Sequence, residues 1–252
     1  LTSLPGVARI PFGLGGLALR GAAPHDKRVY LDEIPVPILY HFGGFASFLP
    51  IDAVDRVDMV ASGAGPEWGG GIGGVVTLDS KSSHPTHWTA DGEVSILHAG
   101  VLAVGPAAGG GSWMIGLRRS YIDAVLAAAQ VDFALAPSYL DAQLQWQSHD
   151  KKWLAIGFAS QDDLHMIHDP NSGVSVGGVD NQGVSAFDYN TRFVRAGLRY
   201  QDNGVSVTPW LGTNAMRATA DQMDLEKGYT RSDTLYGVRA SVARNVLGGT
   251  LR

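Results

Sequence analysis

From Trp88 to the end of the chain, long segments of the sequence alternate strictly between polar and apolar side chains. The alternation is clearest in residues 139–147, 153–160, 192–200 and 236–242. Successive side chains of a β-strand point to opposite faces, so a period of two with one apolar face predicts strands. We count about nine such segments after residue 90, and their succession predicts antiparallel up-and-down strands.

The segments that connect these strands alternate in length. Residues 148–152 and 201–204 are short and turn-like, whereas residues 123–137, 162–190 and 217–232 are long. Outer-membrane β-barrels combine short periplasmic turns with long extracellular loops. The sequence therefore predicts part of a transmembrane β-barrel, in which residues 162–190 form an extracellular loop.

Polar residues in the middle of the expected strands favour a barrel over a soluble β-sandwich. Gln143, Gln145, Arg195 and Arg199 lie on the polar faces, which a polar lumen accepts and the apolar core of a sandwich does not. Aromatic residues also gather near strand ends, as in the girdles of membrane barrels. A soluble β-sandwich binding module is kept as an alternative. The residues expected to face lipid are Leu140, Leu144, Leu154, Ile156, Phe158, Val194 and Leu198.

Residues 1–83 have a different texture, with short apolar runs separated by glycine and proline. These runs are too short to cross a bilayer, which takes about nine to eleven residues per strand. Charged residues such as Arg20, Asp32 and Arg56 would be unfavourable against lipid but acceptable against a polar lumen. We therefore expect a small mixed α+β domain that sits inside the barrel.

The composition argues against several other classes of protein. A net charge of −5 argues against a nucleic-acid binder, and the lack of cysteine excludes a disulfide scaffold and a thiolate metal site. No run of about 18 apolar residues predicts a transmembrane helix, and no signal peptide is recognisable at Leu1. No Ser/His/Asp or paired-carboxylate group has a recognisable spacing, so we expect neither an enzyme nor a cofactor.

The first region contains motifs whose order and spacing resemble the plug domain of TonB-dependent outer-membrane receptors. They are Arg20-Gly21, residues 29–36, residues 40–44, residues 51–60, and a series with Gly63, Pro66, Gly69, Gly73 and Gly74. Residues 104–106, 118–123 and 136–141 resemble the opening strands of the barrel of the same family. The resemblance weakens after about residue 163.

The sequence departs from the family pattern at two positions. The turn that usually reads Asp-Gly is Asp32-Glu33 here, so that turn is expected to have a different geometry. The usual Gly-Pro of the later motif is stretched to Gly63-Ala-Gly65-Pro66.

The resemblance implies a domain organisation and a function. Residues 1–83 would be the plug and residues 88–252 the N-terminal portion of the barrel; since family barrels have about 22 strands, we expect the chain to be a fragment. The whole protein would be a receptor of the bacterial outer membrane for a small-molecule or oligomeric nutrient of the siderophore, cobalamin, glycan or peptide class. Its partners would be membrane lipid and the TonB complex of the inner membrane, with no nucleic acid. A non-transporting adhesion barrel is the alternative.

The resemblance also suggests roles for individual residues. Tyr40, His41 and Phe42 are candidate ligand contacts, because plug loops of the family face the outside. Arg20, Arg118 and Arg119 are candidates for charge pairs that hold the plug. The structural motif of the plug would consist of Arg20, Gly21, Asp32, Gly63, Pro66, Gly69, Gly73 and Gly74.

Two further motifs are expected to have no chemical role. Residues 69–74 match the dinucleotide fingerprint GxGxxG, but a β-branched segment follows where a helix would be needed. A glycine-lined turn close to the barrel wall is therefore expected. His165 and His168 have a spacing found in metal sites, but they lie in a Gly/Asn/Asp-rich segment without companion ligands, so we expect no metal.

Overall fold

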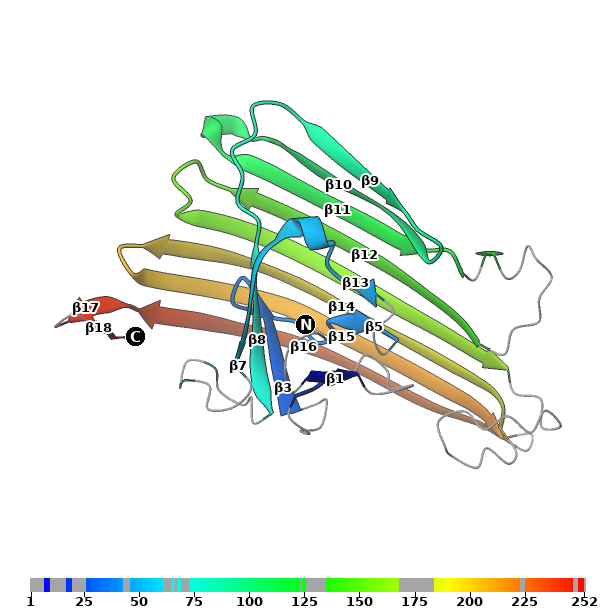
Figure 1. Cartoon of the computed structure of the whole chain (residues 1–252). Helices are drawn as coiled ribbons and strands as arrows, with labels where there is room; N and C mark the ends of the chain where they lie inside the picture. Colours follow the sequence, from blue (N-terminus) through cyan, green and yellow to red (C-terminus); the bar gives the residue numbers. More distant parts are fainter. Residues whose placement is uncertain are drawn as a thin grey trace.

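The structure, a computed structural model, consists mainly of one large and one small β-sheet (Figure 1). No helix among the described residues is long and apolar enough to cross a membrane. The described residues are 7–9, 17–19, 26–42, 46–60, 65, 68, 73–122, 124–125, 135–167, 184–222, 225–246 and 249–251.

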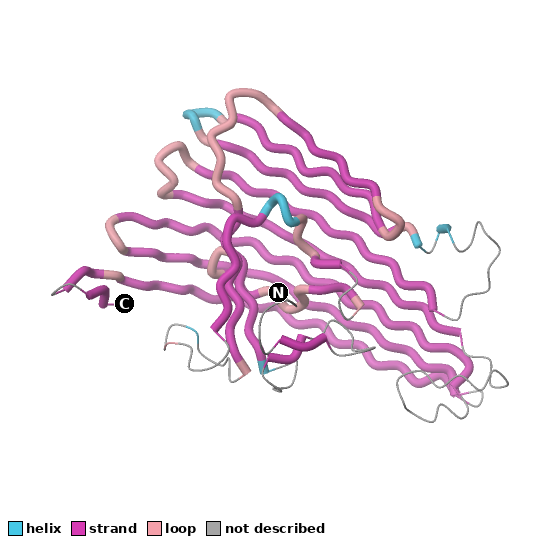
Figure 2. The backbone as a smooth tube through the Cα atoms, in the orientation of Figure 1, coloured by secondary structure: helices cyan, strands magenta, loops and turns pink. Residues whose placement is uncertain are grey.

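The large sheet has eight strands in sequence order, each antiparallel to the next. This confirms the predicted up-and-down topology, and β9 and β16 form the two edges, so the sheet is not closed by the described strands. Figure 2 shows the strands running side by side across a twisted surface. The strands are β9 (Thr89–Val94), β10 (His98–Pro106), β11 (Ser112–Ser120), β12 (Leu135–Gln147), β13 (Trp153–Ile167), β14 (Val184–Asp202), β15 (Val205–Gln222) and β16 (Leu225–Val242). A two-stranded sheet follows, formed by β17 (Arg244–Val246) and β18 (Gly249–Leu251).

Several strands are longer than the alternation predicted. Residues 217–222 and 225–232 were expected in a loop but belong to β15 and β16, and residues 162–167 and 184–190 extend β13 and β14. Residues 168–183 of the expected extracellular loop lie outside the described residues. The prediction failed because these extensions carry polar side chains on both faces, so no apolar period marks them as strands.

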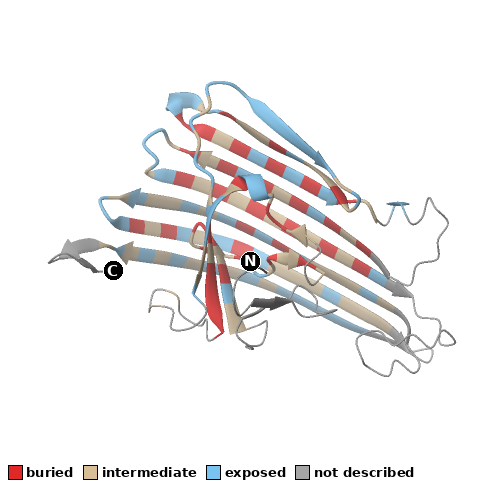
Figure 3. Cartoon of the chain, viewed as in Figure 1, coloured by how far each residue is buried: buried red, intermediate tan, exposed pale blue. Residues whose placement is uncertain are grey.

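The two faces of the large sheet differ in polarity, and Figure 3 shows buried and exposed residues alternating along the strands. Gln143, Gln145 and Arg195 are buried on the inward face, as predicted. The outward face carries exposed apolar side chains, among them four of those predicted to face lipid. Their exposed fractions are 51% for Leu140, 49% for Leu144, 49% for Val194 and 41% for Leu198.

The prediction for β13 was wrong. Leu154, Ile156 and Phe158 are buried on the inward face, with exposed fractions of 1%, 6% and 2%. A period of two tells which residues share a face but not which face is outside. On this strand the large apolar side chains pack inward, and Ala155, Gly157 and Ala159 lie on the outside.

The small sheet lies across the inward face of the large one (Figure 1). It has the strand order β4-β3-β8-β7, with β3 and β8 parallel and the other pairs antiparallel. Its strands are β3 (Lys27–Leu31), β4 (Ile34–Pro35), β7 (Val54–Val60) and β8 (Gly74–Ser80), with a 3-10 helix, η2, at Ile51–Ala53. Two short strand pairs form separate two-stranded sheets: β1 (Val7–Arg9) with β2 (Leu17–Leu19), and β5 (Tyr40–His41) with β6 (Ala46–Ser47).

One apolar core joins the two sheets. Phe48, which is fully buried, lies between Phe158 and Phe193 of the large sheet, with ring centroids 5.7 Å from each. Gly197 permits a close approach, because a Cβ there would lie 2.5 Å from the Cδ1 atom of Ile34. The core residues are Val29, Leu31, Ile34, Val36, Leu39, Phe48, Leu49, Val76, Leu78, Ile156, Phe158 and Phe193.

We predict that Phe48→Ala lowers the free energy of unfolding by about 3–5 kcal/mol, because it leaves a cavity between two rings that cannot close it. Val194→Ala is the control, since Val194 neighbours Phe193 but is 49% exposed on the outward face. Denaturant unfolding in detergent, followed by tryptophan fluorescence, gives both values. Equal losses for the two variants would contradict a shared core.

Candidate functional site: the contact between the two sheets

His41 of β5 is held by carboxylates from two neighbouring strands of the large sheet. Its Nε2 atom donates to Asp141 Oδ2 at 3.0 Å, and its Nδ1 atom donates to Asp162 Oδ1. The imidazole is fully buried and stacks on the ring of Tyr139, with centroids 4.0 Å apart and an interplanar angle of 7°. Arg118 Nη2 also donates to Asp141 Oδ2, at 2.9 Å.

The surroundings of His41 favour its protonated form. Burial by itself lowers the pKa of His41, but hydrogen bonds and charge attraction from Asp141 and Asp162 outweigh it and raise the pKa to about 9. Both ring nitrogens face carboxylate oxygens, and only an imidazolium has a proton on each. With Arg118, the cluster then contains two positive and two negative groups.

A second contact involves the turn between β3 and β4. Arg199 Nη1 donates to Asp32 Oδ1 at 3.1 Å. Burial raises the pKa of Asp32, and the Arg199 guanidinium and the Ser80 hydrogen bonds only partly counter this. The neighbouring Glu33 accepts hydrogen bonds from Ser206 and Thr208 of β15.

Inward-facing side chains of the large sheet also donate to the backbone of the first region. Arg195 Nε donates to Pro35 O at 3.2 Å, Gln143 Nε2 to Phe48 O at 3.3 Å, and Gln145 Nε2 to Lys81 O at 3.3 Å. The polar face that the sequence assigned to a lumen is therefore largely matched to this domain.

An aromatic contact fastens the edge strand β16. The guanidinium carbon of Arg239 lies 3.8 Å from the ring centroid of Trp68 and 4.8 Å from that of Tyr30. Trp68 belongs to the glycine- and proline-rich series noted in the sequence. Cation–π contacts of this kind are stronger where water is excluded.

Beyond these contacts, toward the ends of β14–β16, the inward face carries aromatic and charged side chains. Tyr189, Ala218 and Tyr229 lie in one row across the three strands. The next row contains Met216 and Arg231, and the Arg231 Nε atom donates to Asp233 at 2.7 Å. Tyr229 and Arg231 are exposed on the edge strand β16.

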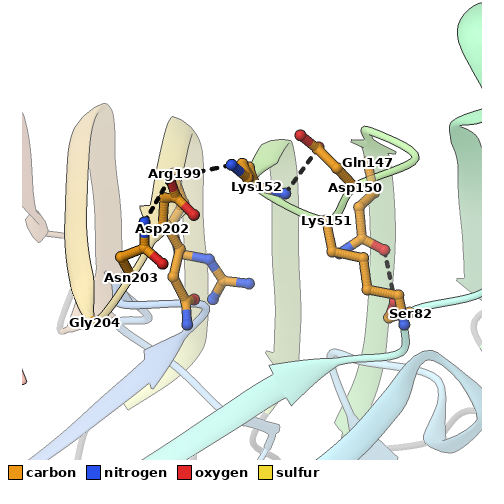
Figure 4. A pocket seen from close by; sticks show the side chains of 10 residues that line it. Ser82, Gln147, Asp150, Lys151, Lys152, Arg199, Asp202, Asn203 and Gly204 are labelled. Atoms are coloured by element: carbon orange, nitrogen blue, oxygen red, sulfur yellow. Dashed lines mark hydrogen bonds and ion pairs between the residues drawn. The ribbon is translucent and has the colours of Figure 1, made fainter.

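A polar cavity of about 410 Å³ lies at the opposite end, between the hairpin turns at residues 148–152 and 201–204 (Figure 4). Lys152 Nζ is 3.1 Å from Asp202 Oδ2, and Asp150 accepts hydrogen bonds from Ser148 and the Lys152 backbone. Arg199 also lines this cavity. The Lys152–Asp202 ion pair therefore joins the two hairpin turns beside the cavity.

The structure places the predicted site residues as follows. His41 is fully buried, whereas Tyr40 and Phe42 are half-buried; ligand contact by the three stays a prediction. Gly73 precedes β8 and Gly74 is its first residue, so a strand follows the GxGxxG motif as expected. Arg118 pairs with Asp141 inside the large sheet. The predicted residues outside the described part of the chain are Arg20, Gly21, Gly63, Pro66, Gly69 and His168.

Sequence reasoning missed the partners of His41. Asp141 was placed on a polar face, and Asp162 was assigned to a loop. In the structure they are brought together because β12 and β13 pair Asp141 with Ser160, which sets Asp162 on the same face, one inward-facing position beyond Ser160. The available signal was a carboxylate at an inward position of two consecutive strands.

Comparisons with known proteins identify the fold. No protein-family model and no curated protein sequence matches the chain. The ferric citrate transporter FecA matches 98% of the chain with a TM-score of 0.61 and 15% identity. The siderophore receptor PirA of Acinetobacter baumannii matches 97% with a TM-score of 0.55 and 14% identity. The FrpB iron transporter of Neisseria meningitidis matches 96% with a TM-score of 0.57 and 11% identity.

The chain thus has the fold of these receptors and spans about 42% of the length of each. The resemblance to TonB-dependent receptors predicted from the sequence is confirmed for the fold. The β-sandwich alternative is wrong.

We predict that the small sheet detaches more easily as the pH rises. The pKa of His41 is raised from 6.5 to about 9, so its stabilising effect is complete below about pH 6.5 and is lost as the pH rises through about 9. The difference is on the order of 3 kcal/mol. Denaturant unfolding between pH 6 and 9.5 should show this slope in the natural protein and a much flatter profile in His41→Gln. The control is His149→Gln in an exposed turn; a slope shared by natural protein and His41→Gln would contradict the assignment.

Proposed function

We propose that this chain is the plug and the first wall strands of a receptor in the bacterial outer membrane, which takes up a nutrient ligand with energy from the TonB complex. Residues 1–83 form the plug and residues 88–252 form part of the wall. The observation that carries the proposal is the inverted polarity of the large sheet. Its outward face carries exposed apolar side chains, whereas its inward face carries buried polar side chains around one apolar core and is covered by the small sheet.

The outward face carries a non-polar section that suits contact with lipid. On β13 its non-polar section runs from Trp153 to Ala159, and the polar residues Gln161, Asp163 and His165 follow. From Trp153 to Ala159 the strand rises about 20 Å, and a tilt of about 40° reduces this to about 15 Å, which is the greater part of the roughly 25 Å apolar band of outer-membrane barrels. Rows of Trp113, Trp146 and Trp153 at the turn end match an aromatic girdle.

A wide polar lumen would leak unless it were filled, and the small sheet fills it. A ligand arriving from the end opposite the short turns would meet Tyr189, Tyr229 and Arg231 first. We include Tyr40, His41 and Phe42 as lower contacts that become available when the small sheet shifts. Release into the periplasm requires the contacts of His41 and the β3–β4 turn to break, which needs work from a partner.

The matching structures are those of a ferric citrate transporter, a siderophore receptor and an iron transporter. Ferric chelates are therefore the first ligands to test, followed by cobalamin, glycans and peptides. The apolar outward face by itself suits a non-transporting adhesion barrel equally well. The small sheet fills the lumen but makes few apolar contacts with the wall outside one core, so it can be displaced. A gate requires a displaceable domain, whereas adhesion does not.

The test expresses the complete gene in a Gram-negative host that lacks its own uptake receptors. Growth on one ligand that requires both this gene and TonB supports the proposal. Surface binding without TonB dependence supports the adhesion barrel. Recovery of the protein in the soluble fraction without detergent overturns the membrane location.

We predict that Leu144→Arg destabilises the folded protein in lipid by about 2–4 kcal/mol, because it places a charge in the middle of the lipid-facing surface. Leu144 is 49% exposed and lies between Ile115 and Gly157 of the adjacent strands. Folding titrations into vesicles measure the effect. Ala108→Arg, in the exposed turn between β10 and β11, should remain near the natural value; a neutral Leu144→Arg would mean that this face does not meet lipid.

A further inference from the structure

The turn between β3 and β4 has a backbone conformation that its sequence does not favour. Leu31 pairs with Ile34, and the two residues between them, Asp32 and Glu33, have φ values of 46° and 71°. Two-residue hairpin turns with both residues left-handed strongly prefer Asn-Gly or Asp-Gly. Aspartate tolerates this region, whereas glutamate is disfavoured there. Glycine would be the less strained residue at position 33.

The glutamate side chain makes contacts that glycine would lack. Ser206 Oγ lies 3.3 Å from each carboxylate oxygen of Glu33 and donates to them, and Thr208 Oγ1 donates to Oε2 in a short bond. Ser206 and Thr208 are alternate residues of β15 and both are buried, Thr208 completely. Buried hydroxyl groups need a hydrogen-bond partner, so the carboxylate fits this part of the wall.

The same turn is tied to the rest of the small sheet. The Asp32 N–H donates to Leu78 O of β8 at 2.9 Å, and the Asp32 carboxylate accepts from Arg199 on β14. The turn therefore connects the β8 backbone to two adjacent wall strands. Displacing the small sheet must break charge-assisted hydrogen bonds at this point.

We propose that Glu33 is a positioning residue that latches the small sheet to the wall and keeps the lumen closed. The inference rests on the part of the proposed function that makes residues 88–252 the wall of a lumen, because only a lumen can be closed. Strain in the turn is retained because the left-handed conformation directs the carboxylate to Ser206 and Thr208. Replacing Glu33 with glycine therefore has two opposite effects. It relieves the strain in the turn, and it removes the hydrogen bonds between the turn and β15.

The test uses the protein expressed from its complete gene and reconstituted in planar lipid bilayers, with ion conductance as the readout. Glu33→Gly and the double variant Ser206→Ala/Thr208→Val should each raise the basal conductance, with the open population increasing about tenfold or more. Combining all three substitutions should raise the conductance little further, because Glu33→Gly and the double variant remove the same contact. Thr213→Val is the matched control, because Thr213 lies on the outward face of β15.

Unchanged or lower conductance for Glu33→Gly, with a higher melting temperature, would overturn the latch and leave Glu33 as a tolerated turn residue. Heat-modifiable electrophoretic mobility verifies that each barrel is folded, and Glu33→Gln with Thr208→Val replaces Glu33→Gly if that variant misfolds. Ligand uptake by the natural protein is measured in parallel. If the natural protein takes up a ligand and the conductance of Glu33→Gly is unchanged, only the latch is overturned. If the conductance of Glu33→Gly is raised but the natural protein neither binds nor takes up any ligand, the proposed function is overturned and the latch is retained.

Discussion

The burial of charged and amide side chains on the inward face of the large sheet is the constraint on which the rest of the structure depends. Asp141, Asp162 and Arg195 would each be unfavourable without a partner once water is excluded. The first region supplies partners that fit: the His41 imidazole between the two carboxylates, and backbone carbonyl groups for the amides and the guanidinium. The position of the small sheet is thus determined by a few polar contacts of defined geometry.

Apolar packing and polar pairing make different contributions to this contact. Burial of Phe48 and Ile34 provides favourable free energy that depends little on exact position. Buried ion pairs contribute less net free energy, because desolvation offsets much of their attraction, but removal of one partner is strongly destabilising. The polar contacts therefore select one placement of the small sheet among the many that an apolar core alone would permit.

The sequence predicted the fold better than the site, for physical reasons. Alternation is a local property, so it placed Gln143 and Arg195 on the inward face, but it did not tell which face of β13 is outside, and Leu154 was misplaced. Asp162 was assigned to a loop because its strand continues past the apolar section. His41 was selected as a ligand contact from a family pattern. Its two carboxylate partners follow from the register of β12 against β13, which no single segment encodes.

The polar contacts between the two sheets and the apolar core respond differently when the small sheet moves within the proposed receptor. When the sheet is displaced, water can replace the hydrogen bonds of Arg195, Gln143 and Glu33, so their loss is partly compensated. The apolar core has no such replacement, since exposure of Phe48 and its neighbours remains unfavourable in water. Displacement is therefore opposed mainly by the core, while the charged contacts act over short distances as latches. Such a contact resists thermal opening and still yields to a force applied from one side, as gating by an external partner requires.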